Sequence, residues 1–120
     1  MSDYASALAQ RERDVNNTLN GGNGSAALVA ALANPPLGCQ DESIRDKSLQ
    51  LVVDCLSSIK DTKGAIDSLD QEQLDTLMKY IYRGLEKNLS PNALLAAHGF
   101  VVSKGGKGTI VRALTEKLTV

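Results

Sequence analysis

The feature that most constrains the fold is a three-turn apolar stripe in the segment Asp70–Leu85. Apolar residues recur there at the spacing i, i+3, i+4, i+7, i+8 and i+11: Leu74, Leu77, Met78, Ile81, Tyr82 and Leu85. A stripe of this width is typical of a helix that faces a core, because a coiled-coil seam is narrower. The segment therefore predicts a central helix on which other elements pack.

The start and end of this helix also have sequence signals. Asp70 and Gln73 have the spacing of a capping box, in which each side chain bonds the other residue's backbone N–H. Leu69 and Leu74 have the spacing of the matching hydrophobic staple. Gly84 is expected to loosen the last turn, because glycine has a low helix propensity.

Other segments with helical signals surround the central helix. The sequence predicts helices over Asp3–Leu19, Ser25–Ala33 and Asp41–Lys60, a helical turn over Ala65–Leu69, a helix opened by Ser90-Pro91 that reaches Val101, and a last short helix after Thr109. Asn20–Gly24 and Gly105–Gly108 read as turns, because glycine and asparagine adopt positive φ at low cost. Asn34-Pro35-Pro36 is expected to end the second helix and Asp61–Gly64 to break the chain after the third. Ser25, Asp41, Ser90 and Thr109 are the expected N-caps.

Four of the other predicted helices have an expected buried side. In the first helix it is formed by Tyr4, Leu8, Val15 and Leu19, and in the third by Ser48, Leu49, Val52, Cys55, Leu56 and Ile59, with Leu51 and Val53 on a second face. In the helix after Ser90 it is formed by Leu94, Leu95, Ala97 and Val101, and in the last helix by Ile110, Val111 and Leu114. Arg11–Asp14 are expected to face solvent, and Gly99 is expected to kink or end its helix.

These signals together predict an all-α fold. No stretch alternates apolar and polar residues with the β-branched and aromatic enrichment of a strand. We expect a single domain over residues 1–120, of six or seven short helices in a bundle built like an αα-hairpin superhelix, with short tails at 1–3 and 115–120. The first two helices resemble one tetratricopeptide-type unit, but no second copy follows at a fixed period.

Composition and charge exclude several classes of protein. The net charge is −1 with both signs interspersed, which is not the basic footprint of a nucleic-acid binder. No basic amphipathic helix suits a membrane surface, and the longest apolar run, 26–33, is too short to span a bilayer. Cys39 and Cys55 lack CxxC spacing and are expected to be free thiols in a reducing compartment. The N-terminus has charges where a signal peptide needs an apolar segment, so a soluble, cytoplasmic protein is expected.

No catalytic, cofactor or metal site can be read from the sequence. GGKGT at Gly105–Thr109 departs from the phosphate-binding loop, because Gly108 separates Lys107 from Thr109 and no strand precedes it. His98 is the only histidine and has no neighbouring partners for metal binding or base catalysis. The acidic residues between Asp67 and Asp75 do not have the spacing of a calcium loop. We therefore expect a protein that is not an enzyme and needs no cofactor.

Two places have residues suited to partner binding. Lys79, Tyr80 and Arg83 are expected beside the apolar stripe of the central helix, and tyrosine and arginine are enriched at interfaces. The alternative is an ordinary helix exterior. In the C-terminal block, Arg112 is expected opposite Ile110 and Leu114, where it could meet an acidic partner, while Leu118 and Val120 continue the apolar pattern past the helix end. The alternative there is a tail that folds back on its own domain.

Three separated blocks resemble one known family. LMKYIYRGL at Leu77–Leu85, ALVAALANPP at Ala27–Pro36 and GTIVRALTEKLTV at Gly108–Val120 are similar to the smallest subunit of the actin-related protein 2/3 complex, in the family's order and over almost the whole chain. The resemblance implies a non-catalytic structural subunit of the assembly that nucleates branched actin filaments, in the actin cytoskeleton. It also implies docking on the β-propeller subunit and a neighbouring scaffold subunit.

The resemblance does not extend to every functional part of the family. Its animal members have a long acidic segment before the first helix that tethers an actin-related protein, whereas only Met1–Asp3 precede the first predicted helix here. The tethering residues are therefore not carried over. The alternative to a complex subunit is a free-standing helical adaptor that binds a peptide in a tetratricopeptide-like groove.

Overall fold

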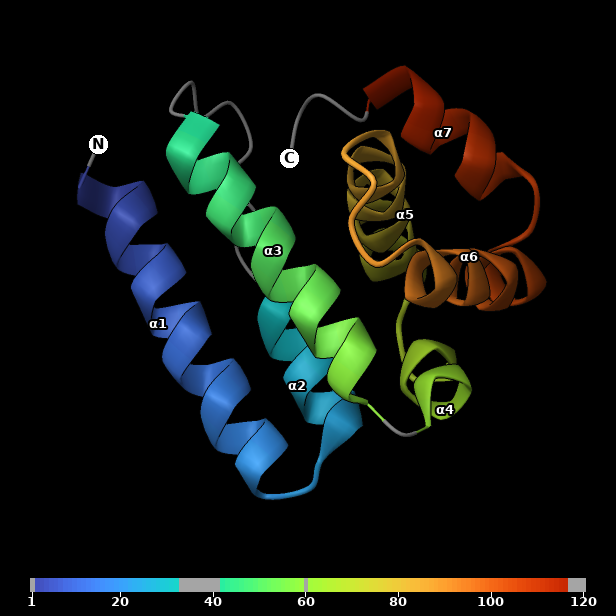
Figure 1. Ribbon diagram of the computed structural model, residues 1–120. Coiled ribbons are helices and arrows are strands. Elements are labelled where there is room, and N and C mark those ends of the chain that lie inside the picture. Colours follow the sequence, from blue (N-terminus) through green and yellow to red (C-terminus); the bar gives the residue numbers. More distant parts are fainter. Residues whose placement is uncertain (1, 33–41, 60, 117–120) are drawn as a thin grey trace.

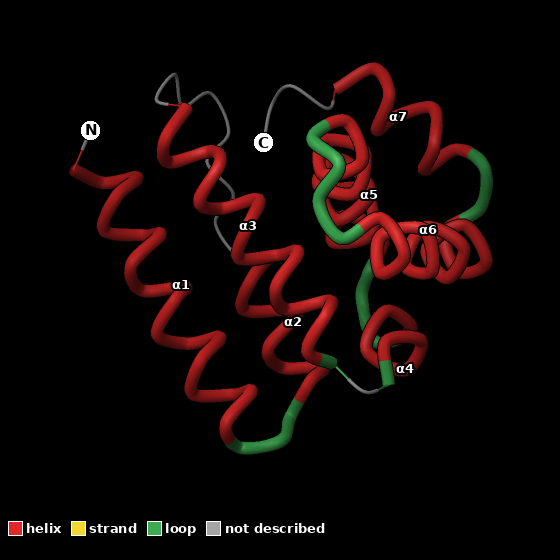
Figure 2. Tube along the Cα trace, viewed as in Figure 1, coloured by secondary structure: helices red, strands yellow, loops and turns green. Residues whose placement is uncertain are grey.

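The described part of the chain is built from helices alone, which confirms the all-α prediction. The computed structural model describes residues 2–32, 42–59 and 61–116, with the side chains of 6–32, 42–59 and 61–115. The helices in these ranges are α1 (Ser2–Asn20), α2 (Gly24–Leu32), α3 (Glu42–Ser58), α4 (Thr62–Asp67), α5 (Gln71–Glu86), α6 (Pro91–Gly105) and α7 (Gly108–Glu116). In Figure 1, α1, α2 and α3 form one group and α4 to α7 the other, and short loops join most of them (Figure 2).

The αα-hairpin of α1 and α2 opens the fold as predicted, but its cap differs. Gly22 in the turn has a φ of 79°, in the left-handed region that glycine adopts without a side-chain clash. The Oδ1 atom of Asn23 accepts a hydrogen bond from the backbone N–H of Ala26 at 3.0 Å, so Asn23 caps α2. The prediction that Ser25 is the cap is wrong, because Asn23 supplies this bond two residues earlier. The predicted stop at 34–36 and the predicted cap at position 41 lie outside the described residues.

The third helix is covered on two faces, as its sequence predicts. The stripe formed by Ser48, Leu49, Val52, Cys55 and Leu56 is buried, and Val53 on the second face is buried as well. The helix contacts α1 and α2 as well as α5 and α6. α3 therefore joins the two groups of helices.

The short helix α4 begins earlier than predicted. Asp61 caps it, with Oδ1 accepting a hydrogen bond from the Gly64 N–H at 3.0 Å. Asp61–Gly64 was expected to be a break, but the cap lets the helix start at Thr62 and places Gly64 in its first turn.

The central helix α5 has the predicted capping box. The Gln73 N–H donates to Asp70 Oδ1 at 2.8 Å, and the Asp70 N–H donates to Gln73 Oε1 at 2.9 Å. The helix contacts α2, α3, α6 and α7, and its buried residues are Leu74, Leu77, Met78, Tyr80, Ile81, Arg83 and Gly84. Four residues of the predicted stripe are in this set, whereas Tyr82 and Leu85 are only partly buried. Tyr80, Arg83 and Gly84 are buried in addition, because α3 covers a second side of the helix.

The end of α5 is a Schellman motif. Asn88 is in the left-handed region with a φ of 58°, and the Leu89 N–H donates to the Gly84 carbonyl at 2.9 Å. The expectation that Gly84 merely loosens this turn is wrong. Gly84 is buried where α5 meets α6 and α3, and a Cβ atom there would lie 2.6 Å from Leu94 Cδ1.

Helix α6 runs without interruption through Gly99, so the expected kink or early end is wrong. Pro91 occupies the first turn as predicted, but Ser90 makes no side-chain cap bond because its backbone is left-handed, with a φ of 37°. Leu94, Ala97 and Val101 are buried as predicted. Leu95 was expected on the same side, yet it is 59% exposed, because it lies next to Leu94 and points away from the core.

One apolar cluster connects the two groups of helices. It contains Val15 from α1, Leu28 from α2, Val52 from α3, Ile66 from α4 and Ile81 from α5, and it extends to α6 and α7. The radius of gyration is 13.0 Å, close to the value of about 14 Å for a compact domain of this length. The helices therefore share a core, while the predicted boundaries of the tails stay predictions.

Candidate partner-binding surface

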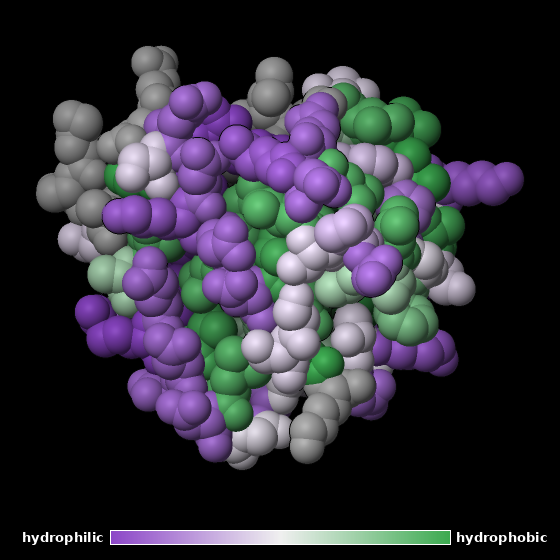
Figure 3. All heavy atoms as spheres, viewed as in Figure 1, coloured by the Kyte–Doolittle hydropathy of each residue, from purple (hydrophilic) through white to green (hydrophobic). Residues whose placement is uncertain are grey.

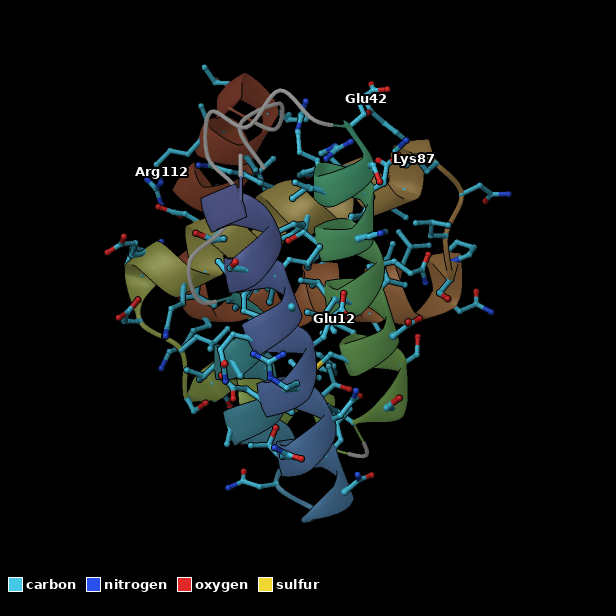
Figure 4. All side chains as sticks on the ribbon, turned by 90° about the vertical axis from the view of Figure 1, so that its left-hand side faces the viewer. Glu12, Glu42, Lys87 and Arg112 are labelled. Atoms are coloured by element: carbon cyan, nitrogen blue, oxygen red, sulfur yellow. The ribbon has the colours of Figure 1, made fainter. Side chains whose placement is uncertain are left out.

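The predicted partner-binding residues do not form one surface in the structure. Tyr80 is fully buried, Arg83 is 6% exposed, and Lys79 is half-buried. Leu118 and Val120 lie outside the described residues, so contacts by these two stay predictions. Arg112 is at the surface on α7, on the opposite side of α1 from Lys87 in the view of Figure 4.

The exterior position expected for Tyr80 is wrong, because α3 covers that side of α5. The Tyr80 hydroxyl lies 3.5 Å from Ser48 Oγ of α3, within a buried polar cluster. Arg11 of α1 donates to the same Ser48 oxygen, and its Nη1 donates to the Ala31 carbonyl of α2 at 3.2 Å. Arg11 was expected to face solvent, but it is only 3% exposed. The cluster joins α1, α2, α3 and α5, so its role is to fix their relative positions.

Arg83 is likewise engaged within the chain. Its Nη2 atom lies 3.4 Å from Asp46 Oδ1 of α3, and Lys87 Nζ lies 3.4 Å from the same oxygen. Figure 4 shows Lys87 close to the first turns of α3. Because Tyr80 and Arg83 are buried against α3, a direct partner contact on this side of α5 remains a prediction only for Lys79.

Helix α7 is tied to α5 by a set of polar contacts that we call the α5–α7 clamp: Gln71, Asp75, Thr109 and Arg112. Arg112 Nε and Nη2 donate to the two oxygens of Asp75 at 2.9 and 3.0 Å, a bidentate pair. Gln71 Nε2 donates to Asp75 Oδ1 at 3.1 Å and lies 3.4 Å from Thr109 Oγ1. Arg112 was expected to meet an acidic partner, but the acid that it meets here belongs to its own chain.

The clamp determines which side of α7 faces inward. Thr109 and Ala113 are fully buried, whereas Val111 is 65% exposed and Leu114 is 53% exposed. The prediction that Val111 and Leu114 pack inward is therefore wrong, and the prediction that Thr109 caps α7 is wrong as well, since the helix begins at Gly108. Small inward residues let α7 approach α5 closely, and hydrophobic atoms gather over α7 in Figure 3. The result is an exposed apolar strip on a short, well-anchored helix.

The residues considered above as candidates for chemistry have structural roles where the structure describes them. His98 Nε2 and the Tyr82 hydroxyl are 2.7 Å apart, with their rings edge to face at 5.4 Å, so this pair joins α5 to α6. Burial raises the pKa of the Tyr82 hydroxyl and raises the pKa of the Cys55 thiol to about 12, so Cys55 is a protonated core residue as predicted. GGKGT spans the end of α6, the turn at Gly106 and Lys107, and the start of α7, with Gly106 at a φ of 81°. Cys39 lies outside the described residues.

The described ranges contain neither a metal-binding cluster nor a membrane-spanning helix. Within 2–32, 42–59 and 61–116, no group of three or more His, Cys, Asp or Glu side chains is placed to hold a metal ion. No helix in the same ranges combines the length and apolar character needed to cross a membrane.

Comparisons with known proteins point to one family. The family model described as ARP2/3 complex 16 kDa subunit (p16-Arc) matches residues 2–120. The chain is 39% identical to actin-related protein 2/3 complex subunit 5 of Dictyostelium discoideum, over 99% of this chain and 88% of that protein. It is 40% identical to subunit 5-C of Xenopus laevis, over 91% of this chain and 75% of that protein. It is 35% identical to the subunit 5-like protein of Homo sapiens, over 89% of this chain and 72% of that protein.

Proposed function

The chain belongs to the family of the 16 kDa subunit of the ARP2/3 complex, and from this we propose that it is a structural subunit of that complex and supports nucleation of branched actin filaments. The observation that carries the proposal is the match along residues 2–120, which includes every helix of the described fold. The alternative of a free-standing peptide-binding adaptor is not favoured, because the relatives are named as subunits of one complex.

The subunit acts by contact and not by catalysis. The polar groups that could have formed a reactive site are engaged in holding helices together: Arg11 with Ser48, Tyr82 with His98, and Arg112 with Asp75. The Cys55 thiol is buried and its pKa is about 12, so it is not a nucleophile at neutral pH. A helical body whose helices are joined by such side-chain contacts is suited to hold other subunits in place.

The partners that we propose are the β-propeller subunit and a neighbouring scaffold subunit, in the cytoplasm with the actin cytoskeleton. These partners come from the resemblance of Leu77–Leu85, Ala27–Pro36 and Gly108–Val120 to the family. An actin-related protein is a further proposed neighbour of the subunit. Leu118 and Val120 are proposed to contribute to docking as apolar residues at the C-terminal end.

Affinity purification of the tagged chain from its native cells tests the proposal. We expect it to elute as part of one large assembly, together with actin-related proteins in equal molar amounts, and we expect no free monomer pool of comparable size. A chain that elutes alone, or with short peptides only, would instead support the adaptor alternative.

A further inference from the structure

The outward side of α7 carries an inference that rests on the proposed function and concerns how the subunit docks. Lys107, Val111 and Leu114 follow one another at spacings of four and three, so they line one side of the helix; we call this line the α7 outer face. Val111 and Leu114 are 65% and 53% exposed, whereas Ala113 between them is fully buried. The helix therefore shows Val111 and Leu114 to the outside, while it buries Ala113 and packs the half-buried Ile110 against the core.

This orientation is held in place by specific contacts. A short amphipathic helix on a core normally turns its largest apolar residues inward, because that removes the most apolar area from water. Here the bidentate Arg112–Asp75 pair and the buried Thr109 hold the helix so that Ile110 packs against the core while Val111 and Leu114 stay exposed. Gly105 lets Thr109 approach, since a Cβ atom on Gly105 would lie 2.6 Å from Thr109 Oγ1. A conflict between local pattern and observed packing is the kind of departure that marks functional surfaces.

Basic residues lie at the start of this face, whereas the last residue of α7 is an acid, Glu116. The sequence from Asn88 to Thr115 contains no aspartate or glutamate, but it contains Lys104, Lys107 and Arg112. Arg112 is paired with Asp75, whereas Lys104 and Lys107 are exposed at the turn that leads into α7. The N-terminus of α7 adds a partial positive charge at the same end. A surface that covers Val111 and Leu114 thus meets basic groups at its edge.

We propose that the α7 outer face docks on an apolar surface of another protein subunit of the complex, and that this surface carries Asp or Glu beside Lys107 and Lys104. The two apolar side chains provide the buried centre, and the lysines provide orientation and faster association. A nine-residue helix is about 14 Å long, so it supplies only part of an interface of about 800 Å² per partner. The α7 outer face is thus one anchor within a larger contact.

Incorporation of matched variants into the complex tests this inference. Leu114→Asp is compared with Leu95→Asp, because Leu95 is a similarly exposed leucine, at 59%, on the neighbouring helix α6 and outside the α7 outer face. We expect Leu114→Asp to lower the apparent affinity for the complex at least about tenfold, and Leu95→Asp to lower it less than about twofold. Both variants should keep the parental melting temperature, since both side chains are exposed. Unchanged incorporation of Leu114→Asp, or equal losses for both variants, would overturn the proposal.

Charge reversal at the helix start gives a second readout. Binding of the parental chain should weaken as salt is raised, and Lys107→Glu should bind more weakly at low salt with a smaller salt dependence. A Lys107→Glu chain with the parental salt dependence would contradict the acidic partner surface. If the parental chain itself does not enter the complex, the proposed function fails. If the parental chain enters the complex and the Leu114→Asp and Lys107→Glu variants bind as well as it does, only this inference fails.

Discussion

Replacing Gly84 with alanine sets two physical effects against each other at the contact of α5 with α6. Helix propensity alone favours the change, because alanine is more stable than glycine in a helix by about 1 kcal/mol. The structure opposes it, since the new Cβ atom would lie 2.6 Å from Leu94 Cδ1 and 3.5 Å from Val53 Cγ2. Leu94 is fully buried, so its side chain has no open space into which to turn.

The packing effect is expected to be the larger one. Overpacking a close-packed core costs about 1–3 kcal/mol. After the propensity gain, Gly84→Ala should lower the free energy of unfolding by about 1 kcal/mol. Urea unfolding followed by circular dichroism measures this, and the midpoint should fall by about 0.5 M at an ordinary denaturant dependence.

Gly99 provides the matched control within α6. It is also a helical glycine, but a Cβ atom there meets nothing within 4 Å. Gly99→Ala should therefore raise the free energy of unfolding by about 0.5–1 kcal/mol, the propensity gain without the clash. In a Leu94→Ala background the clash disappears, so Gly84→Ala should become neutral or stabilising. Equal stabilisation by Gly84→Ala and Gly99→Ala in the parental chain would refute the close approach of α5 to α6.

Three further substitutions test other parts of the fold. Ile81 is fully buried, so Ile81→Ala leaves a cavity in the core and should lower the free energy of unfolding by about 2–5 kcal/mol. An unchanged denaturant midpoint would contradict the central role of α5. Asp75→Asn removes the charge that holds Arg112, and because the pair is partly exposed, the free energy of unfolding should fall by about 0.5–1 kcal/mol. In hydrogen-exchange experiments the backbone amides of α7 should exchange faster, whereas those of α1 should not change and serve as the control. The raised pKa of Cys55, about 12, means that above its ordinary value of 9.0 the unfolded chain loses the thiol proton while the folded chain keeps it. The free energy of unfolding should therefore fall by about 1.4 kcal/mol per pH unit from pH 9 toward 12, and Cys55→Ala should show a smaller slope; equal slopes would contradict the burial of the thiol.

Local sequence signals predicted the helices well where a cap and a wide apolar stripe occur together. Asp70 and Gln73 form the predicted capping box, and Leu77 and Ile81 are fully buried as the stripe required. Helix α2 starts at Gly24 and not at Ser25, and α4 starts at Thr62 and not at Ala65, because Asn23 and Asp61 supply N-cap bonds before the expected starts.

The surface residues were harder to predict, because their exposure depends on which helix covers them. Tyr80 lies outside the main stripe and was expected at the surface, but α3 packs on a second side of α5. Arg11 was expected in water, yet its spacing of three from Leu8 and four from Val15 places it on the buried side of α1. That spacing was the available signal, and the buried partner Ser48 lies 37 residues away in the sequence.

The orientation of α7 was not predictable from its own pattern. Ile110, Val111 and Leu114 make an ordinary inward stripe, yet only Ile110 packs on the core. The exposure of the other two follows from the pairing of Arg112 with Asp75 on α5, 37 residues away. Single-sequence periodicity contains no information on such a contact. This is also where the structure adds most to the functional interpretation, since the apolar residues expected inside are available to a partner.

The central claim is that this chain is a structural subunit on which an actin-nucleating assembly depends. The most direct measurement titrates the purified chain into an ARP2/3 complex from which its own subunit 5 has been removed, and counts actin branches by fluorescence microscopy. Branching should recover with added chain and saturate at one chain per complex, and the chain alone should form no branches. Branching that never recovers although the chain is folded, or recovery without stable binding to the complex, would contradict the account.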